Sequence, residues 1–108
     1  MSESGEWAKA IAAAEVNAGR VVGVTVDGRS VAIYHTADGS FHATDNVCTH
    51  SYAELSDGTL EDHVIECPLH GGQFDVRTGK ALCNPVRKDI AVFPCKVEDG
   101  DVWIRLPG

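Results

Sequence analysis

Apolar residues alternate with polar or small residues along most of this chain. Val22, Val24 and Val26 are separated by a glycine and a threonine, which is the period-two pattern of a strand with one buried face. Further short segments with strand-like composition or alternation are 31–34, 41–43, 59–61, 63–66, 73–76, 90–93, 96–97 and 101–106. The pattern predicts an all-β protein with strands of about five residues.

Four aspartate–glycine pairs lie between these segments: Asp27-Gly28, Asp38-Gly39, Asp57-Gly58 and Asp99-Gly100. Both residues tolerate a positive φ, so the pair is a strong signal for a hairpin turn, and hairpins join antiparallel strands. We therefore predict a small antiparallel β-sandwich or barrel. Pro94 interrupts the segment 90–97 and indicates an edge strand or a bulge, because proline has no amide hydrogen for the ladder.

The length of 108 residues predicts a single domain, and 44% apolar with 23% charged residues is an ordinary globular composition. No apolar run approaches the roughly 20 residues of a membrane-spanning helix. The first six residues carry two glutamates and no basic residue, unlike a secretory signal. We expect a cytoplasmic protein that does not associate with membranes.

The formal net charge is −7, from sixteen acidic and nine basic residues. Nucleic-acid binding needs clustered lysine and arginine, so the charge argues against it. An acidic protein fits a partner with a basic docking face, because complementary fields speed encounter. Solubility alone explains the charge equally well, and both interpretations stay open.

Cysteine and histidine occur together in two short segments, Cys48-Thr49-His50 and Cys67-Pro68-Leu69-His70. Together they offer two thiolates and two imidazoles, in the spacing of a Rieske-type 2Fe–2S centre, where two histidines replace two cysteines on one iron. The flanking residues 44–47, 71–75 and 78–79 extend the match. From Phe41 to Pro85 the chain resembles the small Rieske ferredoxins of multicomponent aromatic-ring-hydroxylating dioxygenases, of the naphthalene, biphenyl and carbazole type.

The resemblance implies one 2Fe–2S cluster with four ligands. Cys48 and Cys67 would hold one iron, and His50 and His70 the other, with both histidines near the surface. The loops would form a cluster-binding subdomain at one end of the fold, over about residues 46–75.

The resemblance also bears on local structure. It implies a first strand over 6–11 and a brief helical turn over 12–16, although the alanine content of this stretch favours helix by propensity alone. Asp45 and Asn46 are expected to fix the turn before Cys48 rather than to bind iron.

The loops differ from those of the high-potential respiratory Rieske proteins, which carry an extra cysteine in each loop and join the two as a disulfide. The matching positions here are Ala53 and Leu69. A serine and a tyrosine that donate hydrogen bonds toward sulfur in those proteins are replaced by Gly72 and Phe74. Such hydrogen bonds stabilise the more negative reduced state. We therefore predict a potential at the low end of the Rieske range, about −150 mV.

The function implied by the resemblance is that of a one-electron carrier rather than an enzyme. It would take electrons from an NADH-dependent, flavin-containing ferredoxin reductase and pass them to the terminal oxygenase, acting as a monomer. The sequence has no nucleotide-binding glycine motif, so the reductase is expected to be a separate chain.

Three alternatives use the same residues differently. A structural zinc module accepts two cysteines and two histidines, but its usual loops pair like ligands with like. An oxygenase needs a second iron site with two histidines and a carboxylate, and the other histidines show no such paired spacing. The small Rieske subunit of another reductase, such as a nitrite reductase, would share the fold.

The remaining cysteines and histidines receive no role in the cluster. We predict that Cys83 and Cys95 are buried thiols and that His35, His42 and His63 are solvated. His63 alone lies close enough in sequence to the second motif to be considered a neighbour of the site.

Overall fold

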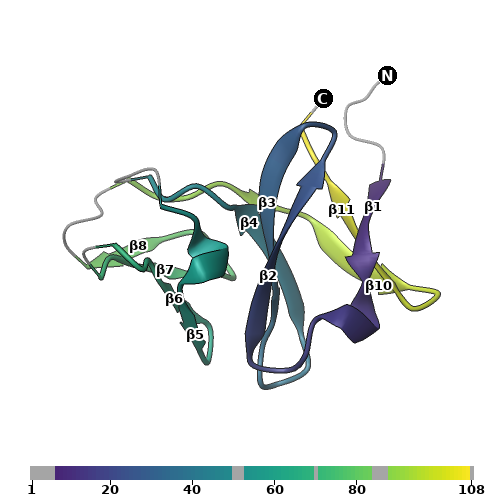
Figure 1. Cartoon of the computed structure of the whole chain (residues 1–108), viewed down its shortest axis with the longest axis horizontal. Helices are drawn as coiled ribbons and strands as arrows, with labels where there is room; N and C mark the ends of the chain where they lie inside the picture. The colour runs from purple at the N-terminus through teal and green to yellow at the C-terminus, as the bar shows by residue number, and fades with distance from the viewer. Residues whose placement is uncertain (1–6, 50–52, 70, 84–87, 108) are drawn as a thin grey trace.

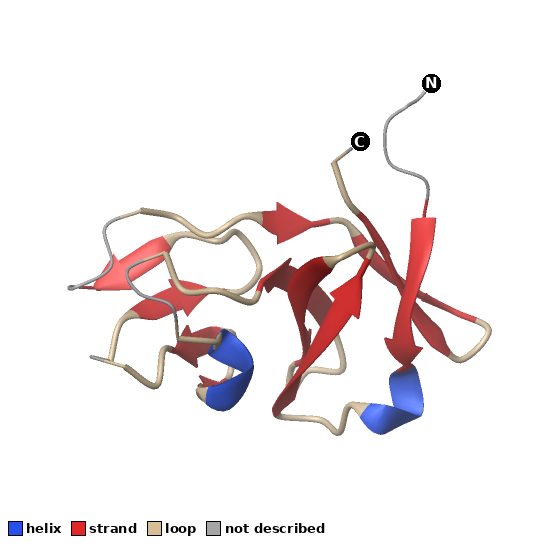
Figure 2. Cartoon of the chain, turned by 45° about the horizontal axis from the view of Figure 1, so that its top comes forward, coloured by secondary structure: helices blue, strands red, loops and turns tan. Residues whose placement is uncertain are grey.

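The computed structural model describes residues 7–49, 53–69, 71–83 and 88–107. In these ranges the chain forms three antiparallel sheets and two short 3₁₀ helices, η1 (Ala13–Glu15) and η2 (Leu55–Asp57) (Figures 1 and 2). The predicted all-β antiparallel class is therefore confirmed. The expected first strand followed by a helical turn is also found, as β1 (Trp7–Ala12) and then η1.

The sheets follow one another along the long axis of the molecule (Figure 1). The terminal sheet has the order β1, β11 (Asp101–Arg105) and β10 (Cys95–Glu98). The central sheet has the order β2 (Arg20–Val26), β3 (Arg29–His35), β4 (Phe41–Asp45) and β9 (Val92–Phe93). The outer sheet has the order β5 (Thr59–Glu61), β6 (Val64–Glu66), β7 (Gln73–Asp75) and β8 (Ala81–Cys83). We call the terminal and central sheets together the base.

Strand β3 is buried on both faces, which explains its unbroken apolar run. Val31 and Ile33 pack toward the terminal sheet with Val102 and Ile104 of β11. Ala32 and Tyr34 point the other way, into a second core with residues of the outer sheet. The outer sheet is therefore held to the base by apolar packing against one face of β3.

The hairpin predictions are confirmed at three of the four aspartate–glycine pairs. Asp27-Gly28 and Asp99-Gly100 have positive φ at both residues, as a type I′ turn requires. Gly39, between β3 and β4, also has a positive φ. The fourth prediction is wrong: Asp57 ends η2, and Gly58 has a φ of −89°.

The turn between β5 and β6 lies instead at Asp62, which has a φ of +54°. Asp57-Gly58 has another role. A Cβ atom on Gly58 would lie 2.1 Å from the carbonyl oxygen of Glu66. The glycine is thus required by a close backbone approach rather than by a left-handed turn.

Pro94 stands where the chain leaves the central sheet for the terminal sheet. β9 pairs with β4, whereas β10, which starts one residue after the proline, pairs with β11. The predicted interruption is confirmed in its edge-strand form, since β9 and β10 are both edge strands of their sheets. The proline marks a change of sheet rather than a bulge within one strand. The carbonyl of Pro94 accepts a hydrogen bond from the amide of Arg105 (3.1 Å), which ties the crossover to β11.

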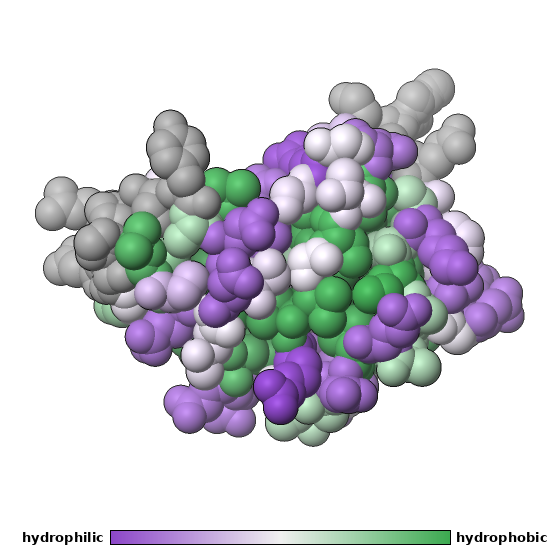
Figure 3. Space-filling view, in the orientation of Figure 1, coloured by the Kyte–Doolittle hydropathy of each residue, from purple (hydrophilic) through white to green (hydrophobic). Residues whose placement is uncertain are grey.

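The face of the molecule seen in Figure 3 shows where the two base sheets meet. Apolar side chains gather between β2 and β1, and polar side chains surround them. β1 and β2 are neighbours without belonging to one sheet. The half-buried apolar residues there therefore cover the edge of the base core.

Candidate metal centre

Two of the four predicted ligands, Cys48 and Cys67, lie in the described residues, and the structure buries both. Their residues are 3% and 1% exposed, and they belong to one packed cluster between β3 and the outer sheet. The two segments, nineteen positions apart in the sequence, therefore bring their sulfur atoms into the same core. His50 and His70 fall outside the described residues, so their predicted place near the surface stays a prediction.

Each cysteine stands at the first position of a loop that its own backbone closes. The amide of Cys48 donates to the carbonyl of Ala53 (2.9 Å), and that of Cys67 donates to the carbonyl of Gly72 (2.7 Å). An isolated bridge between Val47 and Glu54 continues the pairing below the first loop. Both loops are therefore tightly closed at their base, so the cysteine in each is held by backbone hydrogen bonds.

The first loop is also anchored to the segment after β8. The hydroxyl of Thr49 donates to the carbonyl of Lys88 (2.7 Å), and the amide of Asp45 donates to the carbonyl of Ala91 (3.0 Å). Two residues that flank Cys48 thus bind one segment that is distant in sequence.

The residues before Cys48 fix its turn, as predicted. Asp45 accepts two hydrogen bonds from the guanidinium of Arg29 (2.9 and 3.1 Å). Asn46 is buried and bonds to Ser30 and Ser56. Neither side chain is free to act as a ligand, because its polar atoms are already used in holding β3, β4 and η2 together.

The second loop follows the β5–β6 hairpin directly. Ile65 and Phe74, which face each other across β6 and β7, are both fully buried beneath it. Gly71 has a φ of +73°, a conformation that favours glycine. The loop therefore rests on a rigid apolar floor and turns back into β7 through a residue suited to that turn.

The histidines predicted to be solvated are half-buried, and that prediction is wrong. His35 stacks on Phe41, with ring centroids 4.1 Å apart, and its Nδ1 lies 2.8 Å from the carbonyl oxygen of Val16. His63 lies 3.1 Å from the carboxylate of Asp38 through Nε2. His35 ends β3 and His63 lies in the β5–β6 turn, and each is partly covered by a segment distant in sequence, which the local pattern does not reveal.

His42 lies edge-on to His63, and its Nε2 is buried with no hydrogen-bond partner among the described residues. Burial lowers the pKa of His42, and the neighbouring charge of His63 lowers it further. The hydrogen bond from Thr36, followed by that from the amide of Ser40, holds the pKa of Asp38 below its ordinary value. Asp38 belongs to the β3–β4 turn and His63 to the β5–β6 turn, so this polar contact joins the outer sheet to the base.

The prediction of buried thiols is wrong for Cys83 and only partly right for Cys95. Cys83 is exposed at the end of β8, with its sulfur 3.9 Å from the carbonyl oxygen of Gly71. Cys95 is half-buried against the base core, where burial raises the pKa of its thiol to about 11. A protonated thiol is a poor metal ligand.

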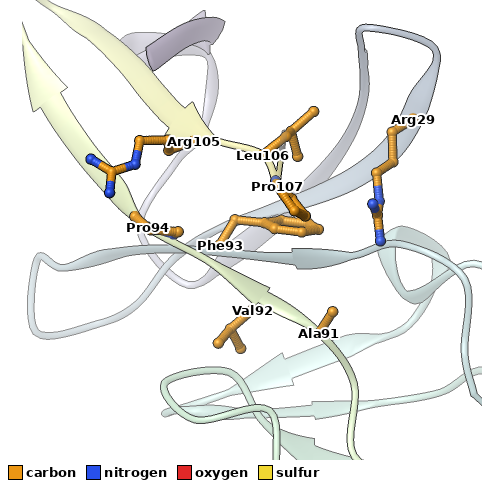
Figure 4. Close-up of a pocket in the computed structure, with 8 residues that line it drawn as sticks. All are labelled: Arg29, Ala91, Val92, Phe93, Pro94, Arg105, Leu106 and Pro107. Atoms are coloured by element: carbon orange, nitrogen blue, oxygen red, sulfur yellow. The ribbon is translucent and has the colours of Figure 1, made fainter. Parts of the chain in front are cut away.

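The largely apolar pocket in Figure 4 lies on the base, beside the β9–β10 crossover, and has a volume of about 280 Å³. Phe93 and Pro107 lie at its centre in that view, with Arg29 on one side and Arg105 and Pro94 on the other. The described residues that line the pocket include neither Cys48 nor Cys67. The guanidinium of Arg29 lies 5.0 Å from the ring centre of Phe93 while it pairs with Asp45.

The donor set suits an iron–sulfur cluster. The two buried cysteines lie on separate closed loops and would supply soft sulfur donors on the inside. Each is followed in sequence by a histidine, whose imidazole would be available to the second iron. Among the described residues no group of three or more cysteine, histidine or acidic side chains could hold a metal ion. The other two predicted ligands, His50 and His70, lie outside the described residues. No helix in the described ranges is long and apolar enough to cross a bilayer.

Comparison with known proteins gives a consistent result. The family model described as the Rieske [2Fe-2S] domain matches residues 6–94. The ferredoxin component of the naphthalene 1,2-dioxygenase system of Pseudomonas putida is 50% identical over 101 residues, which cover 94% of this chain and 96% of that protein.

Solved structures agree with this similarity. A chain from the complex of reduced oxygenase and oxidized ferredoxin in carbazole 1,9a-dioxygenase has a TM-score of 0.84 at 39% identity, with 92% of each chain covered. A putative NADH-dependent nitrite reductase small subunit from Mycobacterium tuberculosis has a TM-score of 0.85 at 31% identity, with 96% of this chain and 97% of that chain covered.

Proposed function

The chain belongs to the Rieske [2Fe-2S] family, and from that premise we propose that it is the ferredoxin of an aromatic-ring dioxygenase system. It carries single electrons to the oxygenase component and has no catalytic role of its own. The observation that carries this proposal is the pair of buried cysteines on two closed loops in a chain that is half identical to such a ferredoxin over nearly its whole length.

We propose Cys48 and Cys67 as the ligands of one iron, and His50 and His70 as those of the other. When bound, the cluster supplies a one-electron redox couple. The protein's own part is to hold the two cysteines away from water and in fixed positions. Burial of both cysteines beside Ile65 and Phe74 supports this role, because an apolar surrounding limits solvent access and sets the local dielectric, and through them the redox potential.

The second loop offers a surface for transfer to a partner. Leu69, which precedes His70 in the sequence, is 47% exposed, and the neighbouring Pro68 is also exposed. A protruding apolar side chain beside a ligand favours close, short-lived contact with another protein. We propose that the oxygenase docks on this end, and that a separate NADH-dependent flavoprotein reductase supplies the electron to a monomeric carrier.

The similarity to a nitrite reductase small subunit favours a second candidate, in which the chain is the Rieske subunit of such an enzyme. The two candidates share the cluster and the fold but differ in their partners. The identity of 50% to a dioxygenase ferredoxin, against 31% to the reductase subunit, supports the first.

A reconstituted electron-transfer assay tests the proposal. The protein is mixed with NADH, the reductase and the oxygenase of a naphthalene dioxygenase-type system, and naphthalene oxidation is measured with and without it. We expect oxidation to depend on the protein and to be lost in Cys67→Ser. If the cluster-loaded protein is not reduced in this mixture but supports NADH-dependent reduction of nitrite with a nitrite reductase large subunit, the second candidate is correct.

A further inference from the structure

Asn46 stands two residues before Cys48, where the first loop closes, and it is 2% exposed. Its side-chain amide nitrogen donates to the hydroxyls of Ser30 and Ser56, each at 3.1 Å. Its side-chain oxygen accepts a hydrogen bond from the amide of Ser56 (2.8 Å). Both donors of one buried side chain are therefore used, and they reach two segments far apart in the sequence.

The backbone of Asn46 joins the same two segments. Its amide donates to the carbonyl of Ser30 (3.1 Å), and its carbonyl accepts from the amide of Leu55 (2.7 Å). Ser30 belongs to β3 in the base, and Leu55 and Ser56 belong to η2, which follows the loop. Five hydrogen bonds at one residue thus fix the entrance of the 48–53 loop, its exit and the strand beneath it.

The space around this side chain depends on Gly23 in β2. A Cβ atom there would lie 2.7 Å from the Ser56 hydroxyl oxygen and 2.9 Å from the Asn46 amide nitrogen. Gly23 is not among the residues with positive φ, so its missing side chain serves the packing and not the backbone conformation. The strand leaves room for Asn46 and Ser56 together.

We propose that Asn46 is the positioning residue of the first cluster loop: it sets where the Cys48 sulfur lies, and thereby the geometry and retention of the cluster. The inference rests on the proposed function only in taking Cys48 as a ligand. Asn46 stands two residues before Cys48, and the hydrogen bonds at Asn46 and Cys48 lie in series along one ladder. A displacement at Asn46 therefore passes directly to the ligand.

A purely structural residue would lower stability without changing the cluster, so the test needs a control of that kind. Ile104 is fully buried in the base core, away from both loops, and Ile104→Val removes one methylene there. We compare Asn46→Ala with Ile104→Val in the loaded protein. The readouts are the EPR g-values and linewidth, the reduction potential, the rate of cluster bleaching with a chelator, and the midpoint of thermal unfolding.

We expect Asn46→Ala to broaden or shift the EPR signal and to speed bleaching by about fivefold or more. The change leaves the Ser30 hydroxyl and the amide and hydroxyl of Ser56, all in part-buried hydrogen bonds, without their partner. Ile104→Val should keep the wild-type spectrum and bleach no more than about twofold faster. The Ser30→Ala, Ser56→Ala double variant serves if Asn46→Ala fails to fold. It keeps the hydrogen bond to the side-chain oxygen and should show the same changes at smaller size.

The inference is wrong if Asn46→Ala, or the double serine variant in its place, keeps the wild-type EPR signal and reduction potential and bleaches no faster than its lower thermal stability explains. Ile104→Val gives the relation between lost thermal stability and faster bleaching. Failure of the proposed function looks different. In that case the wild-type protein itself holds no iron and sulfide and gives no EPR signal when reduced.

Discussion

Replacement of Gly58 by alanine tests the close approach that places the second ligand loop. The new Cβ would lie 2.1 Å from the carbonyl oxygen of Glu66 and 3.1 Å from that of Leu55. Both obstacles are backbone atoms, so no side-chain rotation relieves the contact. Because Glu66 directly precedes Cys67, the backbone shift that removes the clash must reach this proposed ligand.

Overpacking of this kind costs about 1–3 kcal/mol. In a domain of about 100 residues each kcal/mol lowers the unfolding midpoint by roughly 4–8 °C. We therefore expect Gly58→Ala to lower the midpoint by roughly 4–24 °C and to speed cluster loss. Thermal unfolding followed by circular dichroism, together with visible absorbance of the cluster, measures both effects.

Gly28→Ala is the matched control. Gly28 has a φ of +80° and nothing within 4 Å of its added Cβ, so this change tests backbone strain without a clash, at about 1 kcal/mol. It should leave the cluster absorbance unchanged. If Gly58→Ala loses no more stability than Gly28→Ala and keeps its cluster equally well, the close approach at Gly58 has no structural importance and the reasoning is refuted.

Three further changes test the site and its surroundings. His42 has a lowered pKa in the folded chain, so the unfolded chain binds this proton more readily, and the free energy of unfolding should fall as the pH drops below about 6.5. In urea unfolding, His42→Phe should lose less free energy of unfolding between pH 7.5 and 5.5 than the wild type, and an equal loss would contradict this. His70→Cys should keep an iron–sulfur cluster but lower its reduction potential in protein-film voltammetry, since a thiolate adds negative charge. An unchanged potential would contradict the ligand assignment. Gly72→Ser adds a hydroxyl donor beside Cys67 and should raise the potential in the same measurement; a lowered value would argue against hydrogen bonding to sulfur at this position.

The strand pattern could be predicted from the sequence because local and tertiary preferences agree there. The run Val31 to Tyr34 is apolar at every position, and the structure buries it on both faces. The alternation of Val102 and Ile104 likewise places both in one core. The Cys-x-His and Cys-x-x-His spacing indicates the cluster from the sequence, since the proposed ligands of each loop are close in sequence.

The features that could not be predicted depend on contacts between distant segments. The Asp57-Gly58 pair has the composition of a hairpin turn, but packing of η2 against Glu66 determines its conformation. The burial of His42 follows from the approach of the outer sheet, which no local pattern specifies. The sequence predicts that Asn46 fixes the turn before Cys48, but its partners for doing so, Ser30 and Ser56, emerge only in the folded chain.

The central claim is that the two loops hold a binuclear iron–sulfur cluster with mixed cysteine and histidine ligands. The most direct test is EPR of the purified protein after anaerobic reduction, with iron and acid-labile sulfide assayed on the same sample. We predict a red-brown protein with two irons and two sulfides per chain and the EPR signal of a reduced Rieske centre. A colourless protein with one tetrahedral metal ion and no sulfide would contradict the account.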